Sequence, residues 1–369
     1  MKILLLSDSH SEHTEKWTLS LAAKGIKIGL FSFNKSAYKW YDNNNNIQLL
    51  FEPDSIIQGS GIKEKISYFK YLPILKTKIK AFQPDVLHAH YATSYGFIGA
   101  LSGFNPFVIS VWGSDVFDFP KKNFLNKKIL KYALSKATVL CSTSICMKNE
   151  TELYTNKPIS VIPFGIDTDK FNRSEGIYPL QNTSDIVFGN IKPLESKYGI
   201  DILIHTFNKI VKKHPAKKIT LKLIGEGSER KNYEKLTKDL GINHLVMFLG
   251  RIPHQEIVDY HKNIDIFISL SVLDSESFGV SLVEAMSCKS IVIGSNVAGF
   301  NEVLGGNSEV GYLVAKNSED ETVKAIEEIL KNPDIAIKKG EKARLRVLEL
   351  YDWKNNILQM IDVYENLMK

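Results

Sequence analysis

The sequence predicts an α/β protein made of two doubly wound, Rossmann-like domains. Short β-branched apolar runs alternate with helix-like segments along the chain, which is typical of parallel sheets covered by helices on both faces. The chain has 369 residues, more than one hydrophobic core usually serves. Its composition, 44% hydrophobic and 24% charged, is that of an ordinary globular protein.

Each half of the chain carries its own set of expected strands. In the first half, strands are expected at residues 2–7, 26–33, 47–51, 84–90, 107–112, 137–142 and 159–163, with helices near 13–24, 62–82, 94–103, 123–135 and 144–154. In the second half, strands are expected near 185–191, 218–225, 245–250, 264–270, 290–294 and 310–314, with helices between them. Because open parallel sheets bind ligands beyond the carboxyl ends of their strands, two sheets facing across a cleft would form one ligand site.

A stretch rich in turn-forming residues separates the two halves. The strand expected at 159–163 leads into Ile162-Pro163-Phe164-Gly165-Ile166-Asp167, and Asn172, Gly176 and Pro179 follow before the next strand. Such clusters mark loops and linkers. We therefore expect a first domain over residues 1–170 and a second over 171–352.

Several features of the sequence indicate the cellular compartment of the protein. No apolar run approaches the ~20 residues of a membrane-spanning helix, and the apolar core of Met1–Asp8 is too short for a signal peptide. The three cysteines (Cys141, Cys146 and Cys288) lack metal-type spacing, and their odd number argues against a disulfide framework. A cytoplasmic protein is expected.

The segment Lys63–Lys80 combines six lysines and one acid with aromatic and aliphatic residues. A second basic cluster follows Phe117 and Phe119 and contains Lys121, Lys122, Lys127, Lys128 and Lys131. Basic and aromatic residues together favour an anionic membrane surface or a phosphate-bearing lipid. The alternative is a solvated helix face whose lysine stems cover the core. Nothing here leads us to expect a nucleic acid partner.

The best indication of function is the pair Glu276 and Glu284. Seven residues separate them, and they follow the strand expected at 264–270. The order strand, glycine-containing loop and helix places both carboxylates near the strand's carboxyl end. A helix start carries roughly half a positive charge and binds phosphate, whereas carboxylates accept hydrogen bonds from sugar hydroxyls. Together these groups predict a site for a nucleotide-sugar.

The spacing of Glu276 and Glu284 resembles the signature of the family 4 retaining glycosyltransferases, which have the GT-B fold. Ile162–Asp167 is similar to the family's interdomain segment, and the helix expected over 353–369 resembles the closing helix that completes the first domain. The resemblance implies transfer of a sugar, with retention and without a metal, from a nucleotide-sugar to a lipid-linked or polysaccharide acceptor in surface glycan synthesis. A peripheral position at the inner face of the cytoplasmic membrane is expected if the basic and aromatic segments, rather than forming a solvated helix face, contact anionic lipid.

The donor residues are carried over from the same resemblance. Lys197 matches a family lysine that grips the donor diphosphate, and Lys192 is the candidate substitute for the usual arginine, because Asn190 stands in its place. Glu284 is the expected ribose clamp, and Glu276 the expected contact to the donor sugar. The backbone N–H groups of Phe278, Gly279 and Val280 are expected at the distal phosphate or sugar. The nucleotide base is expected beside Arg251 and Ile252.

The first domain resembles the family less closely. Trp112-Gly113-Ser114-Asp115 is similar to a family segment that commonly begins with a histidine touching the donor sugar. Either the Trp112 indole packs against the sugar, or His13 or His90 supplies the polar contact, with Asp115 on the same acceptor and sugar side. Thr14 is interpreted as a cap of the first helix.

Other readings of the chain remain open. A nucleotide-sugar epimerase shares this architecture, and a nucleotide-sugar-binding subunit without catalysis would explain Asn190 and Trp112. No cofactor is expected, because the nucleotide-sugar is a substrate. Asp167-Thr168-Asp169 resembles a metal-binding pair but lies in the interdomain segment, so surface aspartates are the interpretation and no metal site is expected.

Overall fold

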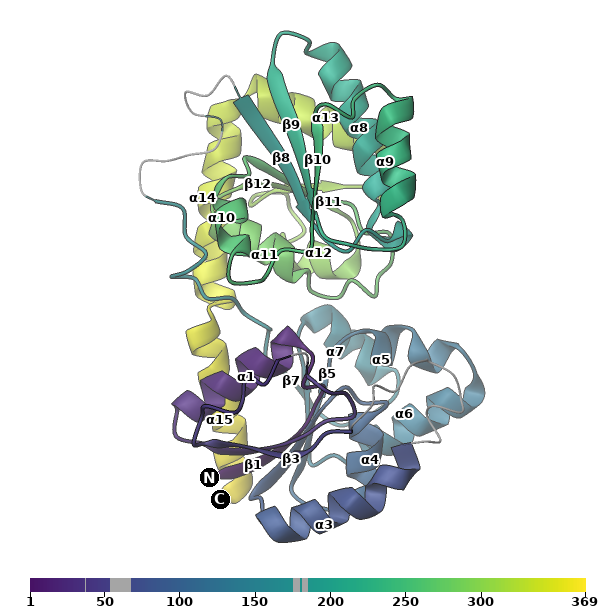
Figure 1. The fold of residues 1–369 in the computed structure, drawn as a ribbon, viewed down its shortest axis with the longest axis vertical. Coiled ribbons are helices and arrows are strands. Elements are labelled where there is room, and N and C mark those ends of the chain that lie inside the picture. The colour runs from purple at the N-terminus through teal and green to yellow at the C-terminus, as the bar shows by residue number, and fades with distance from the viewer. Residues whose placement is uncertain (37, 54–67, 175–179, 181–184) are drawn as a thin grey trace. The chain divides into compact units, whose positions relative to one another are not determined.

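A computed structural model describes residues 1–36, 38–53, 68–174, 180 and 185–369. The chain forms two compact units (Figure 1). The first unit contains Met1–Phe164 together with Lys354–Lys369, and the second contains Gly165–Trp353. The last part of the chain therefore belongs to the same unit as its beginning.

The first unit is built on a parallel sheet of seven strands in the order β3-β2-β1-β4-β5-β6-β7. Its strands are β1 (Lys2–Leu6), β2 (Lys27–Phe31), β3 (Ile47–Phe51), β4 (Val86–His90), β5 (Phe107–Val111), β6 (Val139–Ser142) and β7 (Ile159–Val161). The central strands β4 and β5 are buried along their whole length, as expected for a sheet covered on both faces.

Helices and 3₁₀ turns connect these strands. They are α1 (Glu12–Ala23), η1 (Tyr68–Tyr71), α3 (Leu72–Phe82), α4 (Tyr95–Ser102), α5 (Ser114–Phe117), η2 (Phe119–Lys121), α6 (Phe124–Lys136) and α7 (Ile145–Glu152). Asn123 and Ser144 cap α6 and α7 with their side chains. The interpretation of Thr14 as a cap was wrong. The N-cap of α1 is Ser11, and the buried Thr14 hydroxyl lies 2.7 Å from that of Ser7.

The chain ends in helix α15 (Trp353–Met368), which joins the first unit from Lys354 onward. Tyr364 is fully buried, and its hydroxyl lies 2.6 Å from Nδ1 of His88 on β4. The other ring nitrogen of His88 lies 2.8 Å from the hydroxyl of Ser110 on β5. Burial lowers the pKa of His88 to about 3, so this histidine is neutral at pH 7.

The second unit contains a parallel sheet of six strands in the order β10-β9-β8-β11-β12-β13. Its strands are β8 (Asp185–Ile191), β9 (Lys218–Ile224), β10 (Val246–Gly250), β11 (Ile266–Ser269), β12 (Ile291–Ser295) and β13 (Tyr312–Val314). In both sheets the strand order reverses beside the first strand of the unit. The prediction of two doubly wound α/β domains is confirmed.

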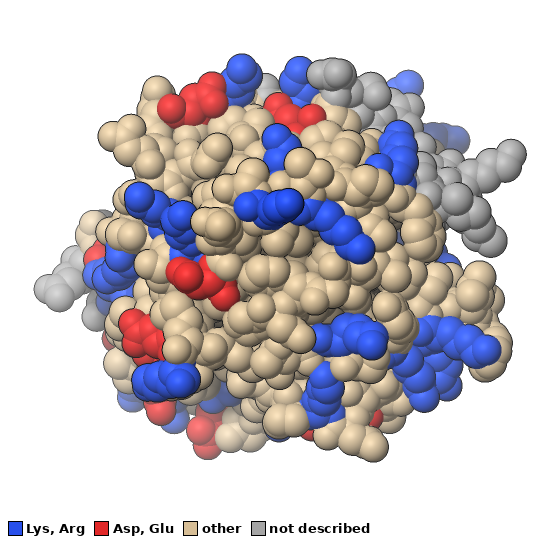
Figure 2. All heavy atoms as spheres, turned by 90° about the horizontal axis from the view of Figure 1, so that it is seen from below, with Lys and Arg blue, Asp and Glu red and all other residues tan. Residues whose placement is uncertain are grey.

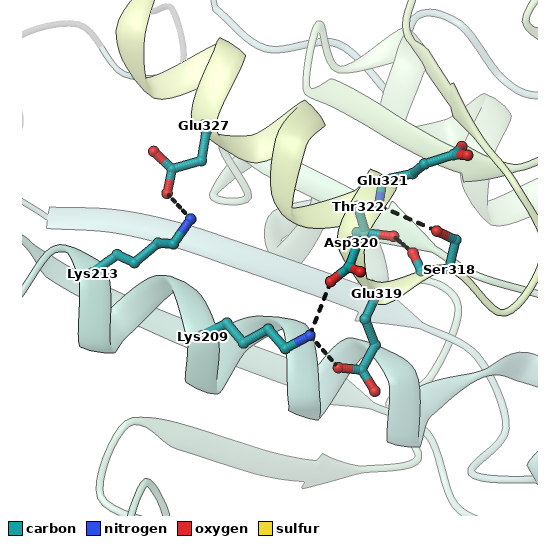
Figure 3. Close-up of polar contacts among 8 residues, drawn as sticks. All are labelled: Lys209, Lys213, Ser318, Glu319, Asp320, Glu321, Thr322 and Glu327. Carbon is teal, nitrogen blue, oxygen red and sulfur yellow. Dashed lines mark hydrogen bonds and ion pairs between the residues drawn. The ribbon is translucent and has the colours of Figure 1, made fainter.

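The connections of the second unit are η3 (Ser196–Tyr198), α8 (Ile200–Lys213), α9 (Arg230–Asp239), α10 (Ile257–Lys262), α11 (Val280–Ser287), α12 (Ala298–Val303), α13 (Glu319–Lys331) and α14 (Pro333–Leu350). Figure 3 shows how α8 and α13 are joined: Lys209 pairs with Glu319 at 2.9 Å and with Asp320 at 3.2 Å. Exposed pairs of this kind contribute little free energy to folding.

Loops at the carboxyl ends of β8, β9 and β11 touch through their backbones. Gly199 has a φ of +63°, and a Cβ there would lie 2.2 Å from the carbonyl oxygen of Leu270. A Cβ on Gly225 would lie 2.1 Å from the carbonyl oxygen of Lys192. Only glycine permits these approaches, so three loops form one closely packed edge. In the described ranges, no helix has the length and apolarity required to cross a bilayer.

Candidate functional site

The predicted donor residues of the second unit come from two neighbouring parallel strands. Lys192 directly follows β8, and Glu276 lies in the loop that joins β11 to α11. Glu284 lies one turn into α11. Since β8 and β11 are adjacent in the sheet, their carboxyl ends share one edge, which is where open parallel sheets bind ligands.

Lys192 and Glu276 form an ion pair. The ammonium of Lys192 lies 2.7 Å from Oε2 of Glu276, and the two side chains are only 10% and 13% exposed. The hydroxyl of Ser271 donates to the same carboxylate oxygen at 3.1 Å. Lys192 also lies over the ring of Tyr198, 5.2 Å from its centroid. Two residues predicted to act separately on a donor are therefore held together.

Glu284 is buried and is held by two histidines. Its Oε1 lies 3.0 Å from Nε2 of His254, and its Oε2 lies 3.1 Å from Nε2 of His261. Burial alone would raise the pKa of Glu284, but the hydrogen bonds with His254 and His261 outweigh it and lower this pKa to about 2. The side chain is a carboxylate at physiological pH, and the two histidines fix its orientation.

The start of α11 presents polar groups of the kind that bind phosphate. Gly279, the residue before the helix, has a φ of +81°, and its carbonyl accepts from the amides of Leu282 and Val283. The Ser281 hydroxyl in the first turn is buried and has no hydrogen-bond partner among the described residues. A buried hydroxyl without a partner is costly, which favours a ligand at this position.

Of the other predicted donor residues, Phe278 contributes only its backbone, because its 3% exposed ring packs edge-on against Tyr351 at 5.2 Å. Lys197 is exposed and lies 5.0 Å from the centroid of the Tyr198 ring. Val280 begins α11. Arg251 is exposed, and Ile252 is partly buried beyond the end of β10. Among the residues described, no three His, Cys, Asp or Glu side chains are grouped so that they could hold a metal ion.

Asn190, which stands where the related family has an arginine, forms a hydrogen bond within the sheet. It is 1% exposed, and its amide donates to the carbonyl of Ile268 on the neighbouring strand at 2.6 Å. Its side chain therefore joins β8 to β11. Lys192 and Lys197 are the cations that the loop after β8 places near this edge.

Four residues of the first unit were predicted on the acceptor and sugar side. Three of them, His13, His90 and Trp112, lie together. The His90 ring lies 4.4 Å from the Trp112 ring, and the His13 ring lies 5.9 Å from Trp112 and 4.4 Å from Phe164. Nδ1 of His90 lies 2.9 Å from the Ser7 hydroxyl. Burial lowers the pKa of His90 well below its ordinary value, so this ring is neutral.

The fourth predicted residue, Asp115, binds the chain's own backbone. Its fully buried carboxylate accepts hydrogen bonds from the amides of Ala92, Trp112 and Gly113, at 2.8, 3.1 and 2.8 Å. Burial raises the pKa of Asp115, against the effect of these amides. In this position the side chain shapes the loops after β4 and β5 around Trp112.

Sequence reasoning missed the partners of the predicted residues. His254 and His261 lie 30 and 23 residues before Glu284, and Ser281 lies inside the signature itself. The only signal for this pair was a histidine just before the short helix α10 and another in its last turn. Tyr198, for which no role was predicted, has its ring centroid 5.2 Å from the Lys192 ammonium and 5.0 Å from the Lys197 ammonium.

Two doubly wound parallel sheets, with carboxylates, lysines and a helix start at the carboxyl edge of the second, define a protein of the GT-B class. The family of glycosyl transferases group 1 matches residues 178–346, and the glycosyl transferase 4-like family matches residues 2–144. The chain belongs to the group 1 glycosyltransferases of the GT4 type.

Relatives and solved structures agree with this assignment. An uncharacterized glycosyltransferase of Methanocaldococcus jannaschii is 26% identical over 313 residues, covering 83% of this chain and 82% of the relative. The N-acetyl-alpha-D-glucosaminyl L-malate synthase of Bacillus anthracis is 25% identical over 300 residues, covering 77% and 75%. Anabaena HepE, solved in complex with UDP, has the same fold with a TM-score of 0.79 at 19% identity, covering 99% of this chain and 100% of HepE.

Proposed function

We propose that the protein is a retaining, metal-independent glycosyltransferase that moves a sugar from a nucleotide-sugar to a glycan or lipid-linked acceptor. The observation that carries the proposal is the arrangement around α11: Glu276, bonded to Lys192, precedes the helix, and Glu284 lies on it. Anabaena HepE, which shares the fold, has been solved with UDP and with UDP-glucose, which supports a nucleotide-sugar donor.

The diphosphate of such a donor gains charge as the sugar leaves. Groups that attract this charge more strongly in the transition state than in the ground state accelerate the reaction. Lys197 is the exposed cation of the loop after β8, and the start of α11 adds a partial positive charge. These groups would neutralise the diphosphate without a divalent ion. In a retaining transfer of this kind, the leaving phosphate would take the acceptor's proton on the same face.

The ion pair gives Lys192 a second role. Since Glu276 already compensates its charge, Lys192 would hold the Glu276 carboxylate toward the donor sugar as well as adding to the field at the diphosphate. Tyr198 fixes the lysine from the other side. The pair would therefore orient the donor sugar, and its lysine would help to stabilise the charge that develops on the diphosphate.

Glu284 is prepared for hydroxyl groups. Each carboxylate oxygen can accept more than one hydrogen bond, so the bonds with His254 and His261 leave capacity for two ribose hydroxyls. A carboxylate whose rotamer is already fixed loses little entropy when it binds. The histidines would thus make Glu284 a preorganised ribose clamp.

Association with a membrane would bring the enzyme to a lipid-linked acceptor. Residues 63–67 of the segment Lys63–Lys80 lie outside the described residues, but Lys70, Lys76 and Lys80 are exposed. In the second basic cluster, Phe124 is 71% exposed beside its lysines. Figure 2 shows a face on which blue Lys and Arg side chains outnumber red Asp and Glu. Such a face would favour anionic lipid.

One assay separates the proposed function from its alternatives. The protein is incubated with radiolabelled nucleotide-sugars, with and without lipid extract and with EDTA, and products are resolved by chromatography. Labelled glycan or glycolipid with retained anomeric configuration, formed in EDTA, is the expected result. An epimerised donor would indicate an epimerase, and binding without turnover would indicate a non-catalytic subunit. Activity lost in EDTA and restored by manganese would contradict metal independence.

A further inference from the structure

The first unit contains a cavity of about 310 Å³ at the carboxyl edge of its own sheet. Asp8 follows β1, Asn34 follows β2, Tyr91 follows β4 and Trp112 follows β5, and all four line it. Its volume equals that of about ten water molecules in the liquid, near the lower end of the range for small-molecule sites. The cavity is built from the first unit alone.

Fixed aromatic rings form one part of the lining. The Phe33 ring is stacked between Tyr68 at 4.5 Å and Tyr95 at 4.4 Å. The indole of Trp112 rests on the His90 ring at 4.4 Å. Trp112 is partly exposed, and a flat ring held in this way offers rigid apolar surface, which matches the C–H face of a sugar ring.

Hydrogen-bonding groups form the other part. The Asn34 amide donates to Oδ2 of Asp8 at 2.7 Å, and Oδ1 of Asp8 accepts from the amide of His10 at 2.9 Å. The pair therefore presents a carboxylate and an amide side by side in a fixed orientation. A carboxylate accepts from hydroxyls, and an amide both donates and accepts. This combination recognises neighbouring hydroxyl groups.

The charge of the cavity distinguishes between kinds of ligand. None of its described lining residues is a lysine or an arginine, and Asp8 is a carboxylate. Burial lowers the pKa of His90, so this ring adds no positive charge at neutral pH. A phosphate placed here would lose solvation and face Asp8, with no compensating cation among the described lining residues. A neutral ligand meets no such penalty.

We infer that this cavity takes an uncharged sugar unit of the acceptor, held by stacking on Trp112 and by hydroxyl contacts to Asp8 and Asn34. The inference rests on the proposed function, since it assigns the acceptor side of the same reaction. It places any phosphate of a lipid-linked acceptor outside the cavity. The acceptor is then a glycan whose terminal residue is neutral, rather than a lipid phosphate receiving its first sugar.

Binding can be measured without turnover. Methyl glycosides of glucose, galactose, mannose and N-acetylglucosamine, each paired with its 6-phosphate, are tested with the full chain by saturation-transfer NMR and calorimetry. At least one neutral glycoside should bind, and its 6-phosphate should bind about tenfold more weakly because of the charge at Asp8. Trp112→Leu should abolish binding of the neutral glycoside. Equal or tighter binding of the phosphates would overturn the inference.

A gain-of-binding variant keeps the test independent of lost folding. Ser94 lines the cavity at the start of α4, and its hydroxyl makes no capping hydrogen bond. Ser94→Lys should therefore raise the affinity for the 6-phosphate about tenfold. Ser135→Lys adds the same charge on the exposed face of α6 and should leave both affinities unchanged. If Ser94→Lys and Ser135→Lys behave alike, the cavity is not the binding site.

Nucleotide-sugar binding by the same preparations separates the two proposals. A protein that binds or hydrolyses a nucleotide-sugar but binds no neutral glycoside refutes the cavity inference and leaves the proposed function intact. A protein that binds glycosides through Trp112 but no nucleotide-sugar refutes the proposed function, and the cavity remains a sugar site.

Discussion

The Lys192 ammonium lies 2.7 Å from the Glu276 carboxylate, although the two residues are 84 positions apart along the chain. The parallel pairing of β8 and β11 brings the two loops together. Both side chains are largely buried, so neither charge is well solvated when its partner is absent. This pairing makes the two residues one functional unit, with consequences for their substitution.

Lys192→Met should lower the free energy of unfolding by roughly 3 kcal/mol, the lower end of the cost of breaking a buried pair. Lys192→Met combined with Glu276→Gln should recover most of that stability, because no unpaired charge remains. Activity should not recover, since both contacts to the donor are gone. Urea unfolding and kcat/KM for the four members of the cycle measure this. Additive stability effects would contradict the pairing.

Lys197→Met should reduce kcat at least tenfold while changing KM less, because a cation at the diphosphate contributes more as charge develops there. Lys231→Met removes an exposed lysine of α9 and serves as the control for net charge. Steady-state kinetics with the identified donor provide the measurement. A variant that changes only KM would show that Lys197 binds the donor without assisting departure.

Glu284→Gln should destabilise the protein at pH 7 by roughly 1.5–3 kcal/mol, the usual contribution of charged hydrogen bonds. The folded pKa of Glu284, about 2, lies below its ordinary value of 4.5. Its contribution is therefore complete above about pH 4.5 and is lost as the pH falls toward 2. The difference in unfolding free energy between wild type and variant should shrink over this window. Urea titrations from pH 7 to pH 3 test it, and a constant difference would contradict the shifted pKa.

Tyr364→Phe should lower the free energy of unfolding of the first unit by roughly 1–3 kcal/mol, because it leaves Nδ1 of the buried His88 without its partner. Tyr260→Phe, which changes a partly buried tyrosine of the second unit, should have a smaller effect. Thermal and urea unfolding of both variants measure the difference. Equal effects would show that the contact between α15 and β4 contributes little.

Replacing Lys70, Lys76, Lys78 and Lys80 by glutamine should reduce sedimentation with anionic vesicles. A lysine near such a surface contributes about 1 kcal/mol, and this attraction weakens as salt is added. Wild-type binding should fall steeply between low and high salt, whereas nucleotide-sugar binding should be the same in both proteins. Sedimentation that is equal for wild type and variant would leave these lysines as a solvated helix face.

The strands were predictable because each is a short apolar run bounded by turn-forming residues, and all thirteen expected runs form strands in the described part of the chain. Lys192 and Glu276 were both proposed from motifs, but their ion pair was not, because it depends on which strands become neighbours. For the same reason, the contacts of His254 and His261 with Glu284 could not be predicted from the sequence.

Other side chains had partners that sequence patterns do not reveal. Asp115 and Asn190 bind backbone groups of adjacent strands or loops, and only the folded chain shows where those groups lie. Thr14 is a residue type that often caps helices, yet it lies inside the first turn of α1, where its hydroxyl contacts that of Ser7. Local patterns identify the elements, whereas the contacts between distant elements decide what each polar group does.

The first unit is assembled from both ends of the chain, since residues 354–369 belong with residues 1–164. The ribosome synthesises residues 1–164 before the second unit and residues 354–369 after it. Domains generally fold as they emerge from the ribosome. The first sheet therefore stays incomplete while the second unit is synthesised and can fold. During this time His88 lacks its contact with the Tyr364 hydroxyl. Synthesis of residues 354–369, rather than emergence of residues 1–164, is therefore the event that completes the first unit. Translation that stops before α15 should yield a folded second unit attached to an incomplete, aggregation-prone first one.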